Sequence, residues 1–337
     1  MGPESRANAV ASIEGGTIST AYFLWVVVAF CAAACWGAIV ILNKQVLDYV
    51  RPLPVNFFVL VVSTASLIVI GVPLSLLHLW SLGFGMTWTA AGYIAISAVV
   101  VWPLAFTAYY YALSSGRVGV VSPITCTDPL FTALFAALLL GTTLGRPTIA
   151  GLLITIVGVI LISRWLDDEP EAHAPILEGA LAATAPAGAG RVVALSLVTA
   201  AGWGLSPVMI QLAERSTGGA TTTMIVLGEG LGVVLLLPFV AARRASLFVS
   251  GPRRADRRRI VVLLAAAGVL NAVFSILFYV LIDQIGPVLT ALITATSPVF
   301  AIAGGVLLLR ERLGTRLALG AGATLAGVLV ATSQHVH

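Results

Sequence analysis

Two carboxylic acids lie inside long apolar stretches of the sequence, where a charged side chain is costly. Asp128 lies in the stretch SPITCTDPLF and Glu229 in TMIVLGEGLG. Burial penalises the charged form of a carboxyl group, so a buried acid can bind and release a proton or neutralise a bound cation. A carboxyl that stays protonated and only packs against a neighbour is the alternative. We predict that Asp128 and Glu229 are proton-coupling residues.

Aromatic and polar side chains recur at helical spacing in two other stretches. Trp102, Phe106 and Tyr109 or Tyr110 follow one face, and a shift of 169 residues sends that face to Asn271, Ser275, Phe278 and Tyr279. An aromatic wall opposite a polar one suits an amphiphilic small molecule, although Trp and Tyr near helix ends also gather at membrane interfaces. The candidate binding residues are Trp36, Trp102, Tyr109, Tyr110, Trp203, Asn271, Tyr279 and Ser297.

Motifs for catalysis or metal binding are missing from the sequence. No HExxH, GxSxG, Walker or dinucleotide motif occurs in the context that its chemistry requires. Cys31, Cys35 and Cys126 form no CxxC pair, and the two histidines of the SQHVH tail are too few for a metal site. We therefore expect no metal, no cofactor and no enzymatic activity. An intramembrane hydrolase with Asp128 and Glu229 as an acid/base pair is the enzyme alternative.

The composition places these residues in a membrane protein. The chain has 337 residues, of which 59% are hydrophobic and 9% charged, against roughly 25% charged in an ordinary soluble domain. Apolar runs long enough to cross a hydrocarbon core of about 30 Å recur along the chain and lack the alternation of barrel strands. We predict an all-α integral membrane protein with ten transmembrane helices: 22–42, 55–77, 89–111, 118–140, 148–165, 192–212, 220–242, 260–282, 287–309 and 315–333.

One phrase of the sequence occurs twice. TDPLFTALFAALLLGTTLG at 127–145 and TSPVFAIAGGVLLLRERLG at 296–314 align with an offset of 169, which places Ser297 where the first copy has Asp128. Each copy carries a proline, Pro129 or Pro298, and a proline inside a helix removes a donor and frees a carbonyl. The phrase therefore predicts a broken helix in each half, with an acid at only one of the breaks.

The repeat divides the chain into two halves of five helices. The predicted boundaries are a flexible tail at 1–21, a first repeat at 22–165, a linker at 166–191, a second repeat at 192–333 and a short tail at 334–337. Because five is odd, the second half enters the membrane in the opposite sense, and inverted repeats are typical of secondary transporters. A complete pathway within one chain favours a monomer.

The basic residues indicate orientation in the bilayer and not a nucleic-acid partner. The formal net charge is +4, and all basic residues except Arg6, Arg146 and Arg215 fall on one face of the ten predicted helices. By the positive-inside rule this face is cytoplasmic, which places both termini outside.

The ordered set of motifs resembles EamA-type members of the drug/metabolite transporter superfamily. It comprises Trp-Gly in the first helix of each half (residues 36–37 and 203–204), YYYAL at 109–113, and then a Pro, a Phe, a Leu run and a Gly-bearing last helix. For Trp36 and Trp203, packing beside the glycines competes with cavity lining. The family's Glu after the fourth helix is present as Glu311, whereas the first half has Thr142 there. The resemblance also implies cytoplasmic termini, contrary to the arginine distribution.

These features together predict a secondary active transporter in the cell (inner) membrane, multi-pass, that works by alternating access at a midplane cavity between the repeats. The resemblance implies a small organic metabolite such as an amino acid, moved outward, and the two acids add possible proton coupling. The two acids fit a cationic drug equally well. A multidrug or cationic-compound efflux carrier is therefore the alternative, and a passive channel is a further one. The expected partners are the substrate, the lipid bilayer and protons.

Overall fold

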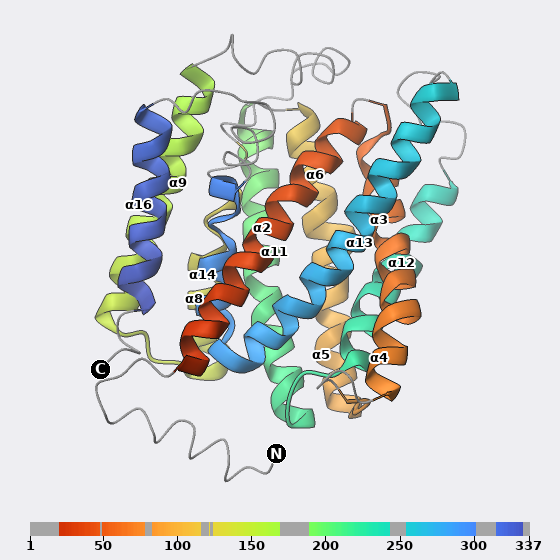
Figure 1. Ribbon diagram of the computed structural model, residues 1–337, viewed down its shortest axis with the longest axis horizontal. Helices are drawn as coiled ribbons and strands as arrows, with labels where there is room; N and C mark the ends of the chain where they lie inside the picture. Colours follow the sequence, from red (N-terminus) through yellow and green to blue (C-terminus); the bar gives the residue numbers. More distant parts are fainter. Residues whose placement is uncertain are drawn as a thin grey trace.

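The computed structural model describes residues 20–47, 49–77, 83–115, 121, 124–168, 189–242, 254–300 and 315–332 (Figure 1). These residues form a bundle of helices, and their one β contact is an isolated bridge between Gly83 and Thr221. Most of the predicted tails and of the linker at 166–191, as well as Glu311, lies outside the described residues.

The first half contributes four long helical segments and one short one to the bundle. They are α2 (Thr20–Leu47); α3 (Pro52–Ser66) with η1 (Leu67–Gly71) and α4 (Val72–Leu76); α5 (Trp88–Val99) with η2 (Val100–Phe106) and α6 (Thr107–Ser115); α8 (Asp128–Leu140); and α9 (Arg146–Asp168). The second half contributes α11 (Ala189–Thr217), α12 (Thr222–Ala241), α13 (Arg254–Ile285), α14 (Pro287–Thr294) and α16 (Thr315–Thr332).

Six of the described helical segments are long and apolar enough to cross a membrane. They are Tyr22–Leu47, Pro52–Leu76, Trp88–Ala112, Gly190–Thr217, Thr222–Ala241 and Arg257–Ile285. Four shorter apolar helices accompany them: Asp128–Leu140, Arg146–Leu161, Pro287–Phe300 and Leu319–Ala331. The prediction of an all-helical membrane protein is confirmed. The count of ten spans stays a prediction, because several predicted spans run into residues that the structure does not describe.

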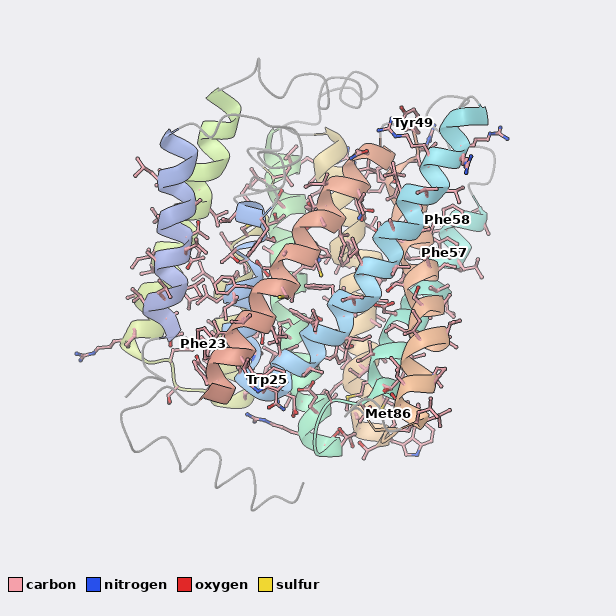
Figure 2. The ribbon with its side chains drawn as sticks, viewed as in Figure 1. Phe23, Trp25, Tyr49, Phe57, Phe58 and Met86 are labelled. Atoms are coloured by element: carbon pink, nitrogen blue, oxygen red, sulfur yellow. The ribbon has the colours of Figure 1, made fainter. Side chains whose placement is uncertain are left out.

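Large apolar side chains cover the outside of the bundle (Figure 2). Phe23 is 57% exposed, Leu138 70% and Val69 71%. A water-soluble domain rarely exposes so many large apolar side chains on all sides, whereas a helix bundle in lipid requires them. The outer surface therefore fits a bilayer as its solvent.

The broken helix predicted for each half is present, and the two breaks have the same hydrogen bonds at positions related by the shift of 169 residues. In the first half, the Thr127 amide donates to the Ile124 carbonyl (3.2 Å) and the Thr127 hydroxyl donates to the same carbonyl (2.7 Å). In the second half, the Thr296 amide (3.0 Å) and hydroxyl (2.7 Å) both donate to the Ile293 carbonyl. Helix α8 then begins at Asp128, and the second break is followed directly by Ser297.

A second irregularity interrupts the helix that carries Trp102. Residues 100–106 form a π-helical stretch, η2, around Pro103, which cannot donate to the preceding turn. The Asn56 side chain of α3 is buried and donates from Nδ2 to the Trp102 carbonyl at 3.0 Å. This bond supplies a partner to a carbonyl within the distorted turn.

The two halves pack on one another reciprocally. Helix α2 packs against α13 and α14, while α11 packs against α5, η2, α6 and α8, so the first helix of each half packs on segments of the third and fourth predicted helices of the other half. The last helices, α9 and α16, pack side by side at one flank of the bundle (Figure 1). The two halves therefore form one bundle in which the first helix of each half packs on helices of the other.

Glycines set the close approach of α9 and α16. A Cβ on Gly158 would lie 2.5 Å from the Thr324 amide nitrogen, and a Cβ on Gly327 would overlap Thr155. These two contacts exchange under the shift of 169 residues, and the Thr155 hydroxyl donates to the Thr324 carbonyl (3.5 Å) between them. Small residues that let backbones touch are the usual basis of helix association in lipid.

Candidate functional site

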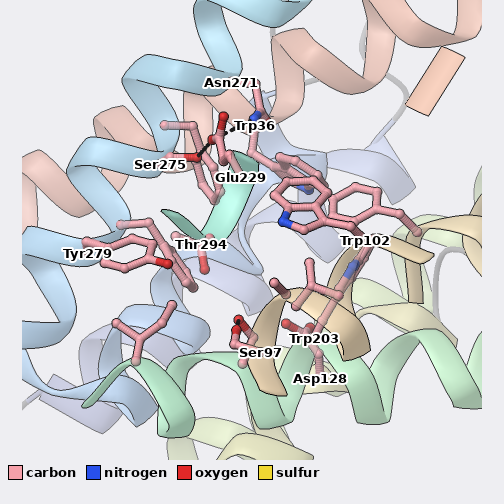
Figure 3. Close-up of a pocket in the computed structure, with 18 of the residues that line it drawn as sticks. Trp36, Ser97, Trp102, Asp128, Trp203, Glu229, Asn271, Ser275, Tyr279 and Thr294 are labelled. Carbon is pink, nitrogen blue, oxygen red and sulfur yellow. Dashed lines mark hydrogen bonds between the residues drawn. The ribbon is translucent and has the colours of Figure 1, made fainter. Parts of the chain in front are cut away.

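A cavity lies at the centre of the bundle, where both halves contribute walls (Figure 3). It contains about 970 Å³ of space not filled by atoms, counting its mouth, and is lined by residues of α2, α5 with η2, α8, α11, α12, α13 and α14. Trp36, Trp203 and Glu229 lie near the middle of α2, α11 and α12. Because these helices are long enough to cross a bilayer, the cavity lies near half depth.

The Glu229 carboxyl is buried and has two unequal oxygens. Oε1 accepts hydrogen bonds from Ser275 Oγ (2.5 Å) and from Asn271 Nδ2 (3.2 Å). Asn271 Nδ2 also donates to Ser63 Oγ at 3.0 Å, which fixes the amide. Oε2 has no hydrogen-bond partner among the described residues. The carboxyl is therefore held in place through Oε1, while Oε2 is buried without a hydrogen bond.

Asp128 is the second acid of the cavity, and its surroundings differ. It is half-buried in the first turn of α8, where unpaired backbone N–H groups stabilise a negative charge. The Thr132 hydroxyl donates to the Asp128 carbonyl at 3.1 Å, and Gly204 of α11 lies so close that a Cβ there would be 2.8 Å from that carbonyl. The break in the helix thus presents the carboxyl to the cavity at a fixed position.

Tryptophans form the apolar walls. The rings of Trp36 and Trp203 meet edge to face with centroids 5.7 Å apart, and Trp36 also contacts Phe274 at 5.1 Å. Trp102 stacks on Phe106 at 4.9 Å. The Trp203 indole Nε1 is buried without a hydrogen-bond partner among the described residues.

No basic side chain lines the cavity within the described part of the chain. The polar groups around the two carboxyls are mainly hydroxyl and amide groups; for example, Ser97 and Ser206 share a hydrogen bond of 2.8 Å. Described residues also provide no group of three His, Cys, Asp or Glu side chains that could hold a metal ion. The described lining therefore combines acidic and aromatic side chains without a basic one.

Comparison with known families gives this arrangement a context. The sequence model of the EamA-like transporter family matches residues 23–164 and again residues 190–333, which together make up most of the chain. The chain belongs to the EamA-like transporter family. As a family member with several apolar spans, it is a multi-pass membrane transporter of the drug/metabolite type.

Two further comparisons concern one short sequence match and one shared fold. The EamA-like transporter is 37% identical over 71 residues to an uncharacterized protein of Methanocaldococcus jannaschii, a match that covers 21% of this chain. The chain spans about half (51%) of the length of that relative. A solved crystal structure of a protein superposes with a TM-score of 0.66 at 16% identity, covering 92% of this chain and 96% of the other, which shows a shared fold.

Most of the residues that the sequence analysis singled out meet in this cavity of the EamA-like transporter. The cavity is lined by Trp36, Trp102, Asp128, Trp203, Glu229, Asn271, Tyr279 and Ser297. Their grouping brings the aromatic and the polar face together, as the repeat register predicts. Their role in binding stays a prediction.

Tyr109 and Tyr110 lie outside the cavity lining, behind the aromatic wall. Tyr109 packs on Trp203 with centroids 4.9 Å apart, and the Tyr110 hydroxyl accepts a hydrogen bond from Asn43 Nδ2 at 2.9 Å. The π-helical stretch at Val100–Phe106 has more residues per turn than an α-helix, so residues after it leave the face that Trp102 occupies. Both tyrosines support the wall.

Several lining residues were not predicted. They are mainly small hydroxyl residues and one aromatic: Ser97, Thr125, Ser206, Phe274 and Thr294. A lone hydroxyl in an apolar run bonds to its own helix as readily as it faces a cavity, as Thr294 does through its bond to the Thr290 carbonyl. The sequence offered no signal to separate these cases.

Proposed function

We propose that this protein is a secondary active transporter that binds a small organic molecule bearing an ammonium group in the central cavity. The supporting observation is the lining itself, in which Asp128 and Glu229 meet Trp36, Trp102 and Trp203 and no basic side chain. An ammonium group pairs with the carboxyls and with the aromatic faces.

The substrate class includes amine metabolites and amino acids with large apolar side chains. A simple amine satisfies the acidic side of the cavity fully. An amino acid also needs a partner for its carboxylate, and the described lining offers hydroxyl groups but no basic side chain for it. The same features fit a cationic drug, so a panel of compounds should include amines, the matching amino acids and permanently charged aromatic cations.

Alternating access follows from the reciprocal packing of the halves. We propose that the halves are inverted repeats: α2 and α11 run in opposite directions through the bundle (Figure 1), and each packs on the corresponding helices of the other half. Exchange of the two conformations would open the cavity to alternate faces. Since one chain supplies both halves, the working unit is a monomer, placed in the inner cell membrane and directed outward.

Proton coupling follows from competition at the acids. A proton and a substrate ammonium group both neutralise the same carboxyl, so the binding of one displaces the other and outward movement of substrate is exchanged for inward movement of protons. Glu229, which lines the cavity, is the carboxyl at which we place this competition.

The test is transport by the purified protein in liposomes with an imposed pH gradient. Asp128→Asn keeps the size of the side chain and removes its charge, and we expect folded protein whose amine transport no longer responds to the gradient. Unchanged coupling in this variant refutes the role of Asp128. Counterflow, in which internal unlabelled substrate accelerates uptake of labelled substrate, separates a carrier from a passive channel.

A further inference from the structure

A third buried carboxyl lies outside the cavity lining, at the end of α11. Glu214 is 1% exposed, and its Oε1 has no hydrogen-bond partner among the described residues. Oε2 accepts one long bond, 3.4 Å, from Gln211 Nε2. Glutamate is almost never fully buried without a partner, because an isolated charge in an apolar interior is very costly. No described residue supplies a charge that neutralises this side chain.

Helix α13 places two ionisable groups beside Glu214. Tyr279 and Ile282 of α13 pack in one buried cluster with Ile210 and Ala213 of α11, directly before Glu214 in the sequence. Tyr279 and Asp283 are four residues apart on α13 and therefore lie on one face of it. Tyr279 also lines the cavity, whereas Asp283 is half-buried next to the end of the helix. The face of α13 that carries Tyr279 and Asp283 thus runs from the cavity toward the end of the bundle where Glu214 lies.

Few other ionisable groups are available at this end of α11. Helix α5 contributes Tyr93, α14 contributes none, and Arg215 follows Glu214 on α11 with its side chain exposed. The remaining acid packed against α11, Asp128, begins α8 on the cavity side. Within the described residues, no cation forms an ion pair with Glu214, and a bound proton is the species that we assign to neutralise it.

We propose that Glu214 is a second proton-binding site, and that Tyr279 links it to Glu229 so that protons pass between the cavity and the bundle end at Asp283. The inference rests on the proposed proton-coupled transport and specifies its route. A bound proton removes the charge of Glu214 and turns its carboxyl into a donor.

The transfer conserves protons at every step. The Glu229 carboxyl gives a proton to the Tyr279 oxygen while the phenolic proton moves on to Glu214, and Glu214 releases a proton to Asp283 and water. Tyr279 is neutral before and after. Water molecules complete any link that is longer than a hydrogen bond. The reverse order carries protons inward to the cavity.

Infrared difference spectroscopy of the purified protein during a pH titration tests the site directly, because protonated carboxyl groups have their own C=O stretching band. We expect Glu214→Gln to lose one such band, Glu229→Gln to lose another, and the double variant to lose both. Arg215→Gln, which removes the exposed charge next door, should retain both bands. A spectrum of Glu214→Gln that matches the wild type overturns the inference.

A second measurement tests the route. In liposomes containing the protein, Tyr279→Phe should retain the Glu214 and Glu229 bands yet exchange protons with the medium more slowly than wild type. Equal exchange rates rule out Tyr279 as the link. If Glu214→Gln does not fold, Glu214→Asp serves instead: its band should shift in frequency, and an unshifted band overturns the assignment.

The two proposals fail separately. Loss of amine binding in Glu229→Gln together with an unchanged spectrum in Glu214→Gln supports the cavity and rejects the second site. If Glu214→Gln loses its band but amine binding is unchanged in Glu229→Gln, the second site is supported and the binding role of Glu229 is rejected.

Discussion

Replacing Glu229 by Gln separates charge from shape at the centre of the cavity. The Gln carbonyl oxygen keeps the acceptor that Ser275 and Asn271 use, and its amide NH₂ takes the place of the unpartnered Oε2. The hydrogen bonds that hold the side chain therefore survive. What is lost is the negative charge that a substrate ammonium group would meet.

The size of the effect follows from the kind of bond removed. A hydrogen bond to a charged group contributes roughly 1.5–3 kcal/mol, and each 1.4 kcal/mol is a factor of ten in affinity, so the amine should bind roughly 10- to 150-fold more weakly. The neutral alcohol of the same shape loses no charge interaction, and its affinity should change little.

Quenching of tryptophan fluorescence provides the assay, because Trp36, Trp102 and Trp203 all line the cavity. The probes are 2-phenylethylamine and its neutral match, 2-phenylethanol, each titrated into wild type and Glu229→Gln. The ratio of the two affinities cancels general effects of the substitution on the fold. A ratio that is the same in both proteins would refute the assignment of Glu229 as the cation partner.

Two further pairs of substitutions, each a test variant and its control, probe the packing that supports the cavity. Gly327→Ala forces a Cβ into the backbone of α9 and should destabilise the protein by about 1–3 kcal/mol, measured by thermal unfolding in detergent. Gly322 lies on the same helix with nothing within 4 Å of its Cβ position, so Gly322→Ala should be neutral or slightly stabilising. Asn56→Leu leaves the Trp102 carbonyl without its side-chain donor and should lower the free energy of unfolding by about 1–3 kcal/mol. The Ser66 hydroxyl bonds only to its own helix, so Ser66→Ala should lower it by less than about 1 kcal/mol. Equal unfolding temperatures within either pair would contradict the packing argument.

The sequence predicts the backbone well where a physical rule acts locally. Apolar length gives the helices, and the prolines at 129 and 298 give the two broken helices, because a missing donor acts on the turn in which it occurs. The register of the repeat also predicts that Trp102 and Asn271 face one cavity, since both halves follow the same pattern.

The sequence fails where a face depends on irregular geometry or on distant partners. Tyr109 and Tyr110 follow the helical spacing of Trp102, but the π-helical stretch rotates them behind the wall. Glu214 escapes notice because it lies near a predicted helix end, where a charged side chain is ordinarily solvated. Only the packing of α11 against α13 shows that it is buried.

The backbone of the two halves is similar, yet the side chains at matching positions differ, and the proposed mechanism uses both facts. At the breaks, Asp128 corresponds to Ser297, and on the third helix of each half Trp102 corresponds to Asn271. A similar backbone lets the halves exchange conformations at little cost in energy, because each adopts a shape that the other already has. In the proposed mechanism, the different side chains fix one orientation of the bound molecule, with its positive group toward the acids and its apolar part against the tryptophans. Strict symmetry of the side chains would remove this preference, so the duplicated phrase has its acid in only one copy.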